Sequence, residues 1–387
     1  MKNQKQLPFL FLVIGLISSD ACRKPAGTQQ NANLNSTRQT QEAPAGGAAA
    51  AGDKFYFRGT IANNLKIEMT IVRDRERLTG TYFYPKVGKN IEVKGTIDKD
   101  GNVDLRETDE TGNETGIFKG KWKPAIEAAD VGLNEIDGKW SKPDGSKEIA
   151  FQLTQQPIEF TAAVRVVPKL IKEANKQAHY TIDVEYPQIE GDPRFDKFNR
   201  EARGLITKDV AAFKTAETAT GSEPGVELPA ETQESSLDIG YEIRYATDDL
   251  ISVEFTEREY SRGAAHPNSA TSVLNYDVKN GKKLVLADLF NAKSNYLNVI
   301  SSYCIKDLRD RSKKDSNLML TDDMIQTGAG ARVDNYKAWA ITKKGLWITF
   351  DPYQVGPYAA GPQYVLVPYS TLKDIIKPDG PIAALAK

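Results

Sequence analysis

The sequence predicts a mainly β chain that continues into an α+β region. Residues 53–156 carry short segments in which apolar and polar side chains alternate, separated by Gly, Asn, Asp and Pro, which is typical of an antiparallel meander. Residues 160–378 combine such segments with two stretches of helical periodicity, which is typical of an α+β domain. The 387 residues, 40% of them apolar, are enough for two domains with cores of their own.

Residues 1–22 have the organisation of an export signal. Two lysines precede an apolar run at 7–17 that is too short to span a bilayer comfortably. Small residues follow, and the segment ends in "SSDAC", in which Cys22 resembles the lipid-acceptor cysteine of bacterial lipoproteins. We therefore predict that Cys22 is lipidated, with ordinary signal-peptidase cleavage after Ala21 as the alternative.

A lipidated cysteine would anchor the mature chain to a membrane. Arg23 stands where the lipoprotein sorting rule has aspartate for inner-membrane retention, so this resemblance implies an outer-membrane lipoprotein that faces the periplasm or the surface. Residues 23–52 contain almost no large apolar side chain and cannot offset the entropy cost of ordering. We expect them to form a disordered tether.

The region 53–156 is expected to be a small all-β domain. Gly80 and Gly95, each followed by threonine, lie inside strand patterns, and glycine there often marks a bend that lets a sheet coil. Eight strands can close on themselves and remove both edges. We predict a lipocalin- or avidin-like barrel, with a strongly coiled open sheet as the alternative. The expected strands are 54–61, 65–74, 77–85, 91–98, 102–109, 115–122, 136–143 and 147–154.

The region 160–378 is expected to hold two main helices on an antiparallel sheet. Asp192 and Pro193 form the cap and first position of one helix, and an Asn280-Gly281 pair predicts a hairpin turn. The expected elements are a strand at 179–189, a helix after Pro193, a hairpin at 237–255, a helix at 288–311, strands at 337–341, 346–353 and 363–369, and a short helix at 371–376.

Composition excludes several classes of function. The 51 basic and 52 acidic residues leave no basic field for nucleic acid. Two cysteines exclude a disulfide framework, and two histidines weigh against a zinc centre. We therefore expect no metal, no cofactor and no nucleic-acid partner, and we assign no catalytic residue.

The second half of the chain resembles a paired module of bacterial cell-envelope proteins. The residues that carry the resemblance are "HYTIDVEYPQI", "YSRGAAHPNSATSVLNYDVKNGKKLVLADLF" and "GLWITFDPYQVGPYAAGPQYVLVPYSTLKDI". The module is similar to the adjacent DUF4163 and DUF3298 domains, both of unknown function. Such pairs form the exported sensor half of a lysozyme-binding anti-sigma factor and the non-catalytic half of certain peptidoglycan deacetylases. The resemblance covers about residues 178–377, and Ala264 departs from it where the module usually has glycine.

The resemblance implies binding or sensing in the envelope rather than catalysis. The expected ligand is a lysozyme-like muramidase or a peptidoglycan glycan, and the resemblance favours a binding protein over an enzyme. Two alternatives stay open. One is a wall-modifying hydrolase related to the deacetylases that uses His266 as its base. The other is a carrier of a small apolar ligand inside the N-terminal barrel.

The candidate ligand-binding residues are His266, Tyr353, Tyr358 and Tyr364. A tyrosine has a large apolar face and one polar tip, which suits a binding surface and equally suits half-buried packing. The alternative to ligand binding is a structural role, in which His266 fixes a turn with Pro267 and the tyrosines hold a proline-rich crossover onto the sheet. Cys304 and the segment 98–104 are expected to be structural, as a core side chain and a hairpin turn.

Overall fold

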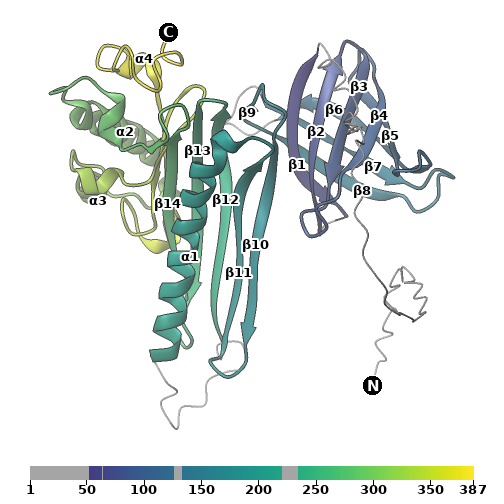
Figure 1. Ribbon diagram of the computed structural model, residues 1–387. Helices are drawn as coiled ribbons and strands as arrows, with labels where there is room; N and C mark the ends of the chain where they lie inside the picture. The colour runs from purple at the N-terminus through teal and green to yellow at the C-terminus, as the bar shows by residue number, and fades with distance from the viewer. Residues whose placement is uncertain (1–51, 63, 126–132, 220–233) are drawn as a thin grey trace, which may run out of the picture. The chain divides into compact units, whose positions relative to one another are not determined.

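The computed structural model describes residues 52–62, 64–125, 133–219 and 234–387 (Figure 1). The expected signal peptide, Cys22 and nearly all of the expected tether lie outside the described residues. None of the described helices combines the length and the apolar character that crossing a bilayer requires.

The first eight strands close into an antiparallel barrel, as the sequence predicts. Each strand pairs with its neighbour in the chain, and β1 also pairs with β8, so the alternative of an open sheet is wrong. The strands are β1 (Asp53–Ile61), β2 (Leu65–Asp74), β3 (Arg77–Phe83), β4 (Ile91–Ile97), β5 (Asn102–Thr108), β6 (Glu114–Pro124), β7 (Asn134–Ser141) and β8 (Ile149–Gln156).

The barrel interior is filled with side chains. Sixteen buried apolar residues form one cluster, among them Phe57, Ile67, Tyr82 and Phe118. The glycines permit the tight coiling: a Cβ on Gly95 would lie 1.8 Å from the carbonyl oxygen of Asp104 on the next strand. An interior packed in this way lends no support to the hypothesis that the barrel carries an apolar ligand.

A seven-stranded sheet forms the centre of the second region. Its order is β10, β11, β12, β13, β14, β15, and β9 pairs with β12. The sheet is antiparallel except where β12 pairs with β11 and with β9. A parallel neighbour requires a long crossover, and α1 lies in that crossover. The strands are β9 (Ile158–Glu159), β10 (Arg165–Asn175), β11 (Tyr180–Glu190), β12 (Ser235–Thr247), β13 (Leu250–Tyr260), β14 (Asn268–Asp277) and β15 (Lys282–Lys283).

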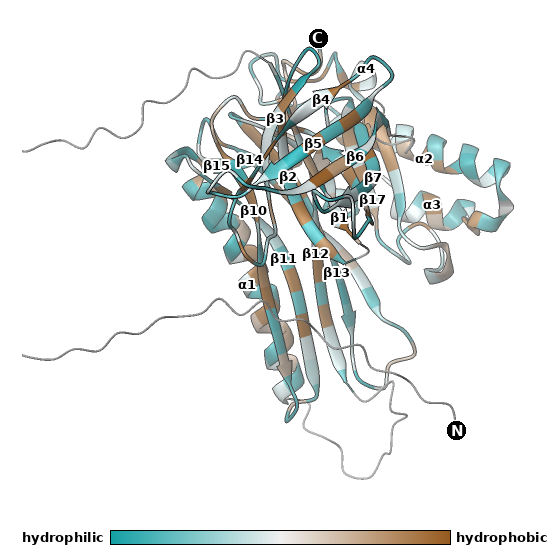
Figure 2. Ribbon diagram, turned by 90° about the vertical axis from the view of Figure 1, so that its right-hand side faces the viewer, coloured by the Kyte–Doolittle hydropathy of each residue, from teal (hydrophilic) through white to brown (hydrophobic). Residues whose placement is uncertain are grey.

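One face of this sheet is covered by α1 (Asp196–Ala219), which lies along the strands (Figure 1). The helix starts where the sequence predicts: Asp192 accepts a hydrogen bond from the Arg194 amide and caps a 3-10 turn, Pro193–Phe195, that leads into α1. Phe195 of this turn packs on the sheet together with Phe198 and other apolar side chains of the helix. Figure 2 shows the matching alternation of hydrophobic and hydrophilic residues along β11, β12 and β13.

The opposite face of the sheet is partly covered by a three-stranded sheet that the sequence does not predict as a separate layer. Ser252 accepts a hydrogen bond from the Ile341 amide, and the Asn275 side chain donates to the carbonyl of Trp339. Helices pack on the far side of this small sheet in a second core. The elements are β16 (Trp339–Ile341), β17 (Gly345–Phe350), β18 (Gln363–Pro368), α2 (Tyr296–Lys314), α3 (Asp322–Gly328) and α4 (Tyr369–Leu372).

The second helix begins later than expected. The sequence predicts 288–311, whereas α2 runs from Tyr296 to Lys314. Asp288 instead lies in a 3-10 turn, Leu286–Leu289, where its carboxylate accepts a hydrogen bond from the Val285 amide. The inward stripe is confirmed, because Ile300, Cys304 and Leu308 of this helix are fully buried.

Candidate functional site

The site is built around the crossover, defined as residues 351–362, which joins β17 to β18. Prolines remove backbone donors along it, so it cannot continue either strand. It folds instead through short-range bonds: the Gln354 amide donates to Asp351, and the Ala360 amide donates to Pro357 (3.0 and 2.9 Å).

Gln354 fastens the crossover to the helical layer. Its side-chain amide donates to the carbonyl oxygens of Gly328 (3.0 Å) and Asn335 (2.9 Å). Gly328 ends α3 so close to the crossover that a Cβ there would lie 1.7 Å from the carbonyl oxygen of Gln354. Val355 is buried beside it. These contacts hold the crossover in one position relative to the sheet.

Three of the predicted residues meet in an aromatic cluster, defined as His266, Tyr353 and Tyr358. The ring of His266 stacks on Tyr358, with centroids 3.9 Å apart, and Tyr353 lies 5.6 Å from Tyr358. Tyr358 donates a hydrogen bond to the carbonyl of Pro267 (2.7 Å). Tyr353 has a φ of 71°, in the left-handed region, and its side chain is 56% exposed. The backbone thus holds an apolar ring in solvent at some cost.

Hydrogen-bonding groups lie beside both ring nitrogens of His266. Nδ1 lies 2.9 Å from the carbonyl oxygen of Pro267, which can only accept, so Nδ1 carries the proton. Nε2 lies 3.3 Å from the Tyr353 hydroxyl. The preceding loop does not need the missing glycine: the left-handed residue is Gly263, and Ala264 has no positive φ.

Tyr364, the fourth predicted residue, does not join this cluster. It belongs to an aromatic stack, defined as Arg244, Trp347 and Tyr364. The Trp347 and Tyr364 rings stack with centroids 5.3 Å apart, and the Arg244 guanidinium lies 4.6 Å from the centroid of Trp347. Tyr364 keeps 41% of its side chain exposed, so its outer side is open to solvent.

A buried carboxylate holds the aromatic stack from behind. Glu254 on β13 is 4% exposed; its carboxylate accepts from Arg244 Nε and from the hydroxyl of Thr349, both at 2.9 Å. Sequence analysis missed Arg244, Trp347 and Glu254. Each lies in an ordinary strand pattern, and only the packing of the two sheets brings them together.

Asp351 lies at the start of the crossover, two residues before Tyr353. One of its carboxylate oxygens accepts from the Thr271 amide on β14 (3.1 Å). The other oxygen, Oδ1, is buried and has no hydrogen-bond partner among the described residues. Burial raises the pKa of this carboxyl above its usual range.

The remaining predicted sites are structural where the structure describes them. Cys304 is fully buried on α2, and burial raises the pKa of its thiol. Asp98 closes the β4–β5 hairpin by accepting from the amides of Asp100 and Asn102. Among the described residues, no three His, Cys, Asp or Glu side chains are placed to hold a metal ion.

Two family models match adjacent parts of the second region. The model described as "Deacetylase PdaC" matches residues 173–269, which end just after His266. The model described as "Protein of unknown function (DUF3298)" matches residues 287–370, which include the whole crossover. The aromatic cluster therefore draws its residues from both matched segments.

A curated relative and two solved structures are similar to this chain. The peptidoglycan-N-acetylmuramic acid deacetylase PdaC of Bacillus subtilis (strain 168) is 27% identical over 194 residues, 50% of this chain. The chain spans only 38% of that relative's length. A DUF3298 family member from Bacteroides fragilis is 18% identical, with a TM-score of 0.42 over 59% of this chain and 99% of its own. One from Pseudomonas aeruginosa is also 18% identical, with a TM-score of 0.39 over 56% and 94%.

Proposed function

We propose that this protein is an exported, lipid-anchored cell-envelope protein that binds peptidoglycan glycan without cleaving it. The observation that carries the proposal is the aromatic cluster, in which His266 and Tyr353 are held exposed by hydrogen bonds and stacking. Aromatic side chains held rigidly at a surface lose little entropy on binding. The aromatic stack at Tyr364 supplies a second exposed ring of the same kind.

The chemistry of both sets suits a sugar ring. A pyranose offers an apolar C–H face bordered by hydroxyl groups, which matches an aromatic plane bordered by hydrogen-bonding groups. Here the imidazole and the tyrosine hydroxyls provide that border. The exposed rings form two small sets and not one broad apolar patch, which favours a chain of sugars over a protein partner.

The comparisons support an extracytoplasmic, wall-related role. The matched family models are those of a deacetylase and of a domain of unknown function, and the relative's printed name is that of a peptidoglycan deacetylase. The relative is matched over 38% of its length, so we carry over the wall association and not the reaction. Lipidation at Cys22 would keep the described domains at the envelope.

The hydrolase alternative requires His266 to act as a general base. Its Nε2, the atom that would take a proton, already lies 3.3 Å from the Tyr353 hydroxyl. Among the described residues no carboxylate hydrogen-bonds to the other ring nitrogen, which contacts the adjacent Pro267 carbonyl. The arrangement suits a ring held in place better than a base poised over a substrate. A His266→Ala variant that loses a wall-modifying activity of the wild type would revive this alternative.

The test is retention of the full chain by purified peptidoglycan and by immobilised lysozyme, at low and raised salt. We expect retention by peptidoglycan that survives raised salt, because stacking on rings is not screened. Tyr353→Ala and Tyr364→Ala should each weaken retention roughly tenfold. Tyr358→Phe keeps the stacked ring and should weaken it less than Tyr358→Ala.

The matched control is Val333→Ala, which truncates a side chain that is 66% exposed on another element. It should leave retention unchanged. A lysozyme-like muramidase is the other partner that the resemblance suggests. Retention by lysozyme alone, lost in the same tyrosine variants, would assign the surface to a protein partner and reject the glycan. Retention by neither would reject both.

A further inference from the structure

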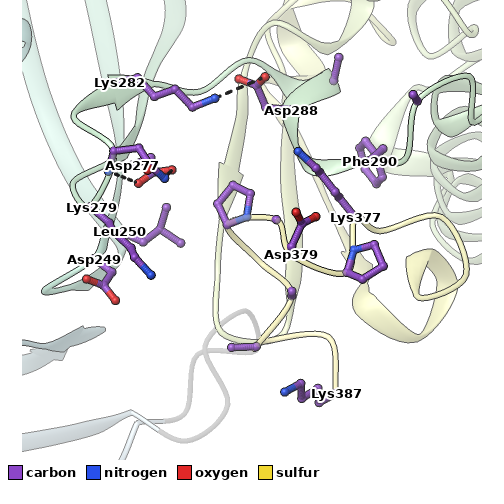
Figure 3. Close-up of a pocket in the computed structure, with 18 residues that line it drawn as sticks. Asp249, Leu250, Asp277, Lys279, Lys282, Asp288, Phe290, Lys377, Asp379 and Lys387 are labelled. Carbon is purple, nitrogen blue, oxygen red and sulfur yellow. Dashed lines mark hydrogen bonds and ion pairs between the residues drawn. The ribbon is translucent and has the colours of Figure 1, made fainter.

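The α+β region also contains a hollow that is lined in part by charged side chains (Figure 3). It has a volume of about 780 Å³, which is in the size range of small-molecule sites. One wall comes from the turn before β13 and from the turn between β14 and β15. The other wall comes from residues 377–384, after α4. No residue of the aromatic cluster or the aromatic stack lines it.

The second wall is fixed to the fold. Phe290 forms a β-bridge with Ile376, and the Lys377 amide donates to the carbonyl of Leu289 (2.9 Å). The Gly380 amide then closes a turn onto Lys377 (2.9 Å), and Ile382 is fully buried in the core. These backbone contacts therefore fix the positions of the residues on either side of this turn relative to the rest of the α+β region.

The hollow is lined by equal numbers of acidic and basic residues, and only some of these side chains have hydrogen bonds or ion pairs within the protein. Four aspartates and four lysines line it, so it has no preference for a polyanion or a polycation. Asp277 is occupied by both nitrogens of Asn280, and Asp288 accepts from Val285 and lies 3.8 Å from Lys282.

Five other charged side chains line the hollow: Lys387, and four that stand on the two walls. Asp249 and Lys279 stand on the sheet side, and Lys377 and Asp379 stand on the facing wall (Figure 3). Within the part of the chain that the structure describes, none of these four side chains has a hydrogen bond or an ion pair. Each wall thus offers one unused carboxylate and one unused ammonium group to the same space.

We propose that this hollow binds a short zwitterionic peptide with small side chains. A free ammonium group would meet the carboxylates of Asp249 or Asp379, and a free carboxylate would meet Lys279 or Lys377. The rest of the lining includes small apolar residues, against which methyl groups can pack: Ala287, Ala292, Ala383, Ala384, Pro378 and Pro381. This site is independent of the proposed glycan surface.

The experiment is calorimetric titration of the full chain with three probes: trialanine, N-acetyl-trialanine and trialanine amide. Trialanine should bind roughly tenfold more tightly than either blocked form, since each block removes one charge-assisted contact. Asp379→Asn should weaken the preference for a free ammonium group, because it removes one of the two carboxylates that would meet this group, while keeping the preference for a free carboxylate. Lys377→Gln should do the reverse.

The control variants are Asp323→Asn on α3 and Lys208→Gln on α1, which neutralise exposed charges outside the hollow. They should bind all three probes as the wild type does. Thermal unfolding of each variant shows whether it is folded. Equal affinity for the three probes, no binding at millimolar trialanine, or unchanged preferences in both hollow variants would each overturn the proposal. Peptidoglycan retention is measured separately, so its failure leaves this result intact.

Discussion

Glu254 shows at the scale of one residue how the exposed aromatic stack is supported. The carboxylate is buried and has two partners: Arg244 on the adjacent strand β12, and Thr349 on β17 of the small sheet. Arg244 in turn lies against Trp347, on which Tyr364 stacks. A buried charge that loses its partner costs more than the pair gains, so the integrity of the stack depends on Glu254.

We predict that Glu254→Ala lowers the free energy of unfolding by about 2–3 kcal/mol, because it removes the buried carboxylate to which Arg244 and Thr349 both donate. Urea unfolding of the full chain measures this change. Glu242→Ala is the matched control, since Glu242 also pairs with Arg244 but has a side chain that is 67% exposed. The control should change stability by roughly 0.5 kcal/mol or less. Equal losses in both variants would contradict the role given to Glu254.

Asp351 makes stability at the site depend on pH. Its pKa is raised by burial in the folded state, so the folded protein holds the proton more tightly than the unfolded chain. The stability contributed there is greatest below the pKa of unfolded aspartate, about 3.9, and is lost as pH rises through the folded pKa.

We therefore predict that Asp351→Asn gains stability relative to the wild type between pH 4 and pH 7, since asparagine cannot ionise but can still accept from the Thr271 amide. Urea unfolding at several pH values measures the difference between the two proteins. Asp323→Asn, at an exposed position on α3, should show no such trend. If the difference in free energy of unfolding between Asp351→Asn and the wild type stayed constant across this range, ionisation of the buried carboxylate would not destabilise the fold.

At the scale of elements, local patterns were enough for the barrel and for the start of the first helix. Each barrel strand pairs with its neighbour in sequence, so alternation and turns determine the order. The start of α1 follows from one capping residue and one proline, Asp192 and Pro193. The predicted start of α2 was wrong because the Asp288 carboxylate caps a separate 3-10 turn. In sequence, an aspartate that caps such a turn looks the same as one that caps an α-helix.

The layer formed by β16, β17 and β18 depends on contacts that sequence does not reveal. β16 has only three residues, and it is held to the large sheet by Ser252 and Asn275. The candidate site has the same origin. His266 and Tyr353 are 87 residues apart and meet only because the crossover lies beside the loop before β14. Sequence named the members of the aromatic cluster through residue type, but it placed Tyr364 with them and missed Trp347.

The contact between α3 and the crossover gives a prediction about elements. Gly328→Ala should destabilise the fold by roughly 2 kcal/mol or more, because the new Cβ would lie 1.7 Å from the Gln354 carbonyl oxygen and the crossover must move. Peptidoglycan retention should weaken with it, although no ring is altered. Unfolding and retention are measured on the same preparation.

The matched control is Gly204→Ala on α1, where nothing lies within 4 Å of the added Cβ. That change should leave retention intact and raise stability by up to about 1 kcal/mol, since alanine favours a helix. If Gly328→Ala kept full stability and full retention, the crossover would not depend on its contact with α3.

At the scale of the whole molecule, the barrel and the α+β region differ in the groups that they offer to a ligand. The barrel is packed with apolar side chains, and the exposed aromatic rings and the charged hollow both belong to the α+β region. A protein that binds an insoluble polymer gains from being held near it, because tethering raises the effective concentration of the site. This gives the predicted lipid anchor a physical purpose in the proposed function.

We predict that Cys22→Ser moves the full-length protein, produced in a Gram-negative host, from the membrane fraction to the soluble periplasmic fraction. Cysteine is the acceptor of the acyl chains, and the apolar run at 7–17 is too short to hold the chain in a bilayer by itself. Cys304→Ala is the matched control: it removes the other thiol, which lies buried in the α2 core, and should leave the protein in the membrane fraction. Persistence of Cys22→Ser in the membrane would instead mean that the leader is retained or that another segment binds the membrane. A soluble wild type would favour ordinary cleavage after Ala21.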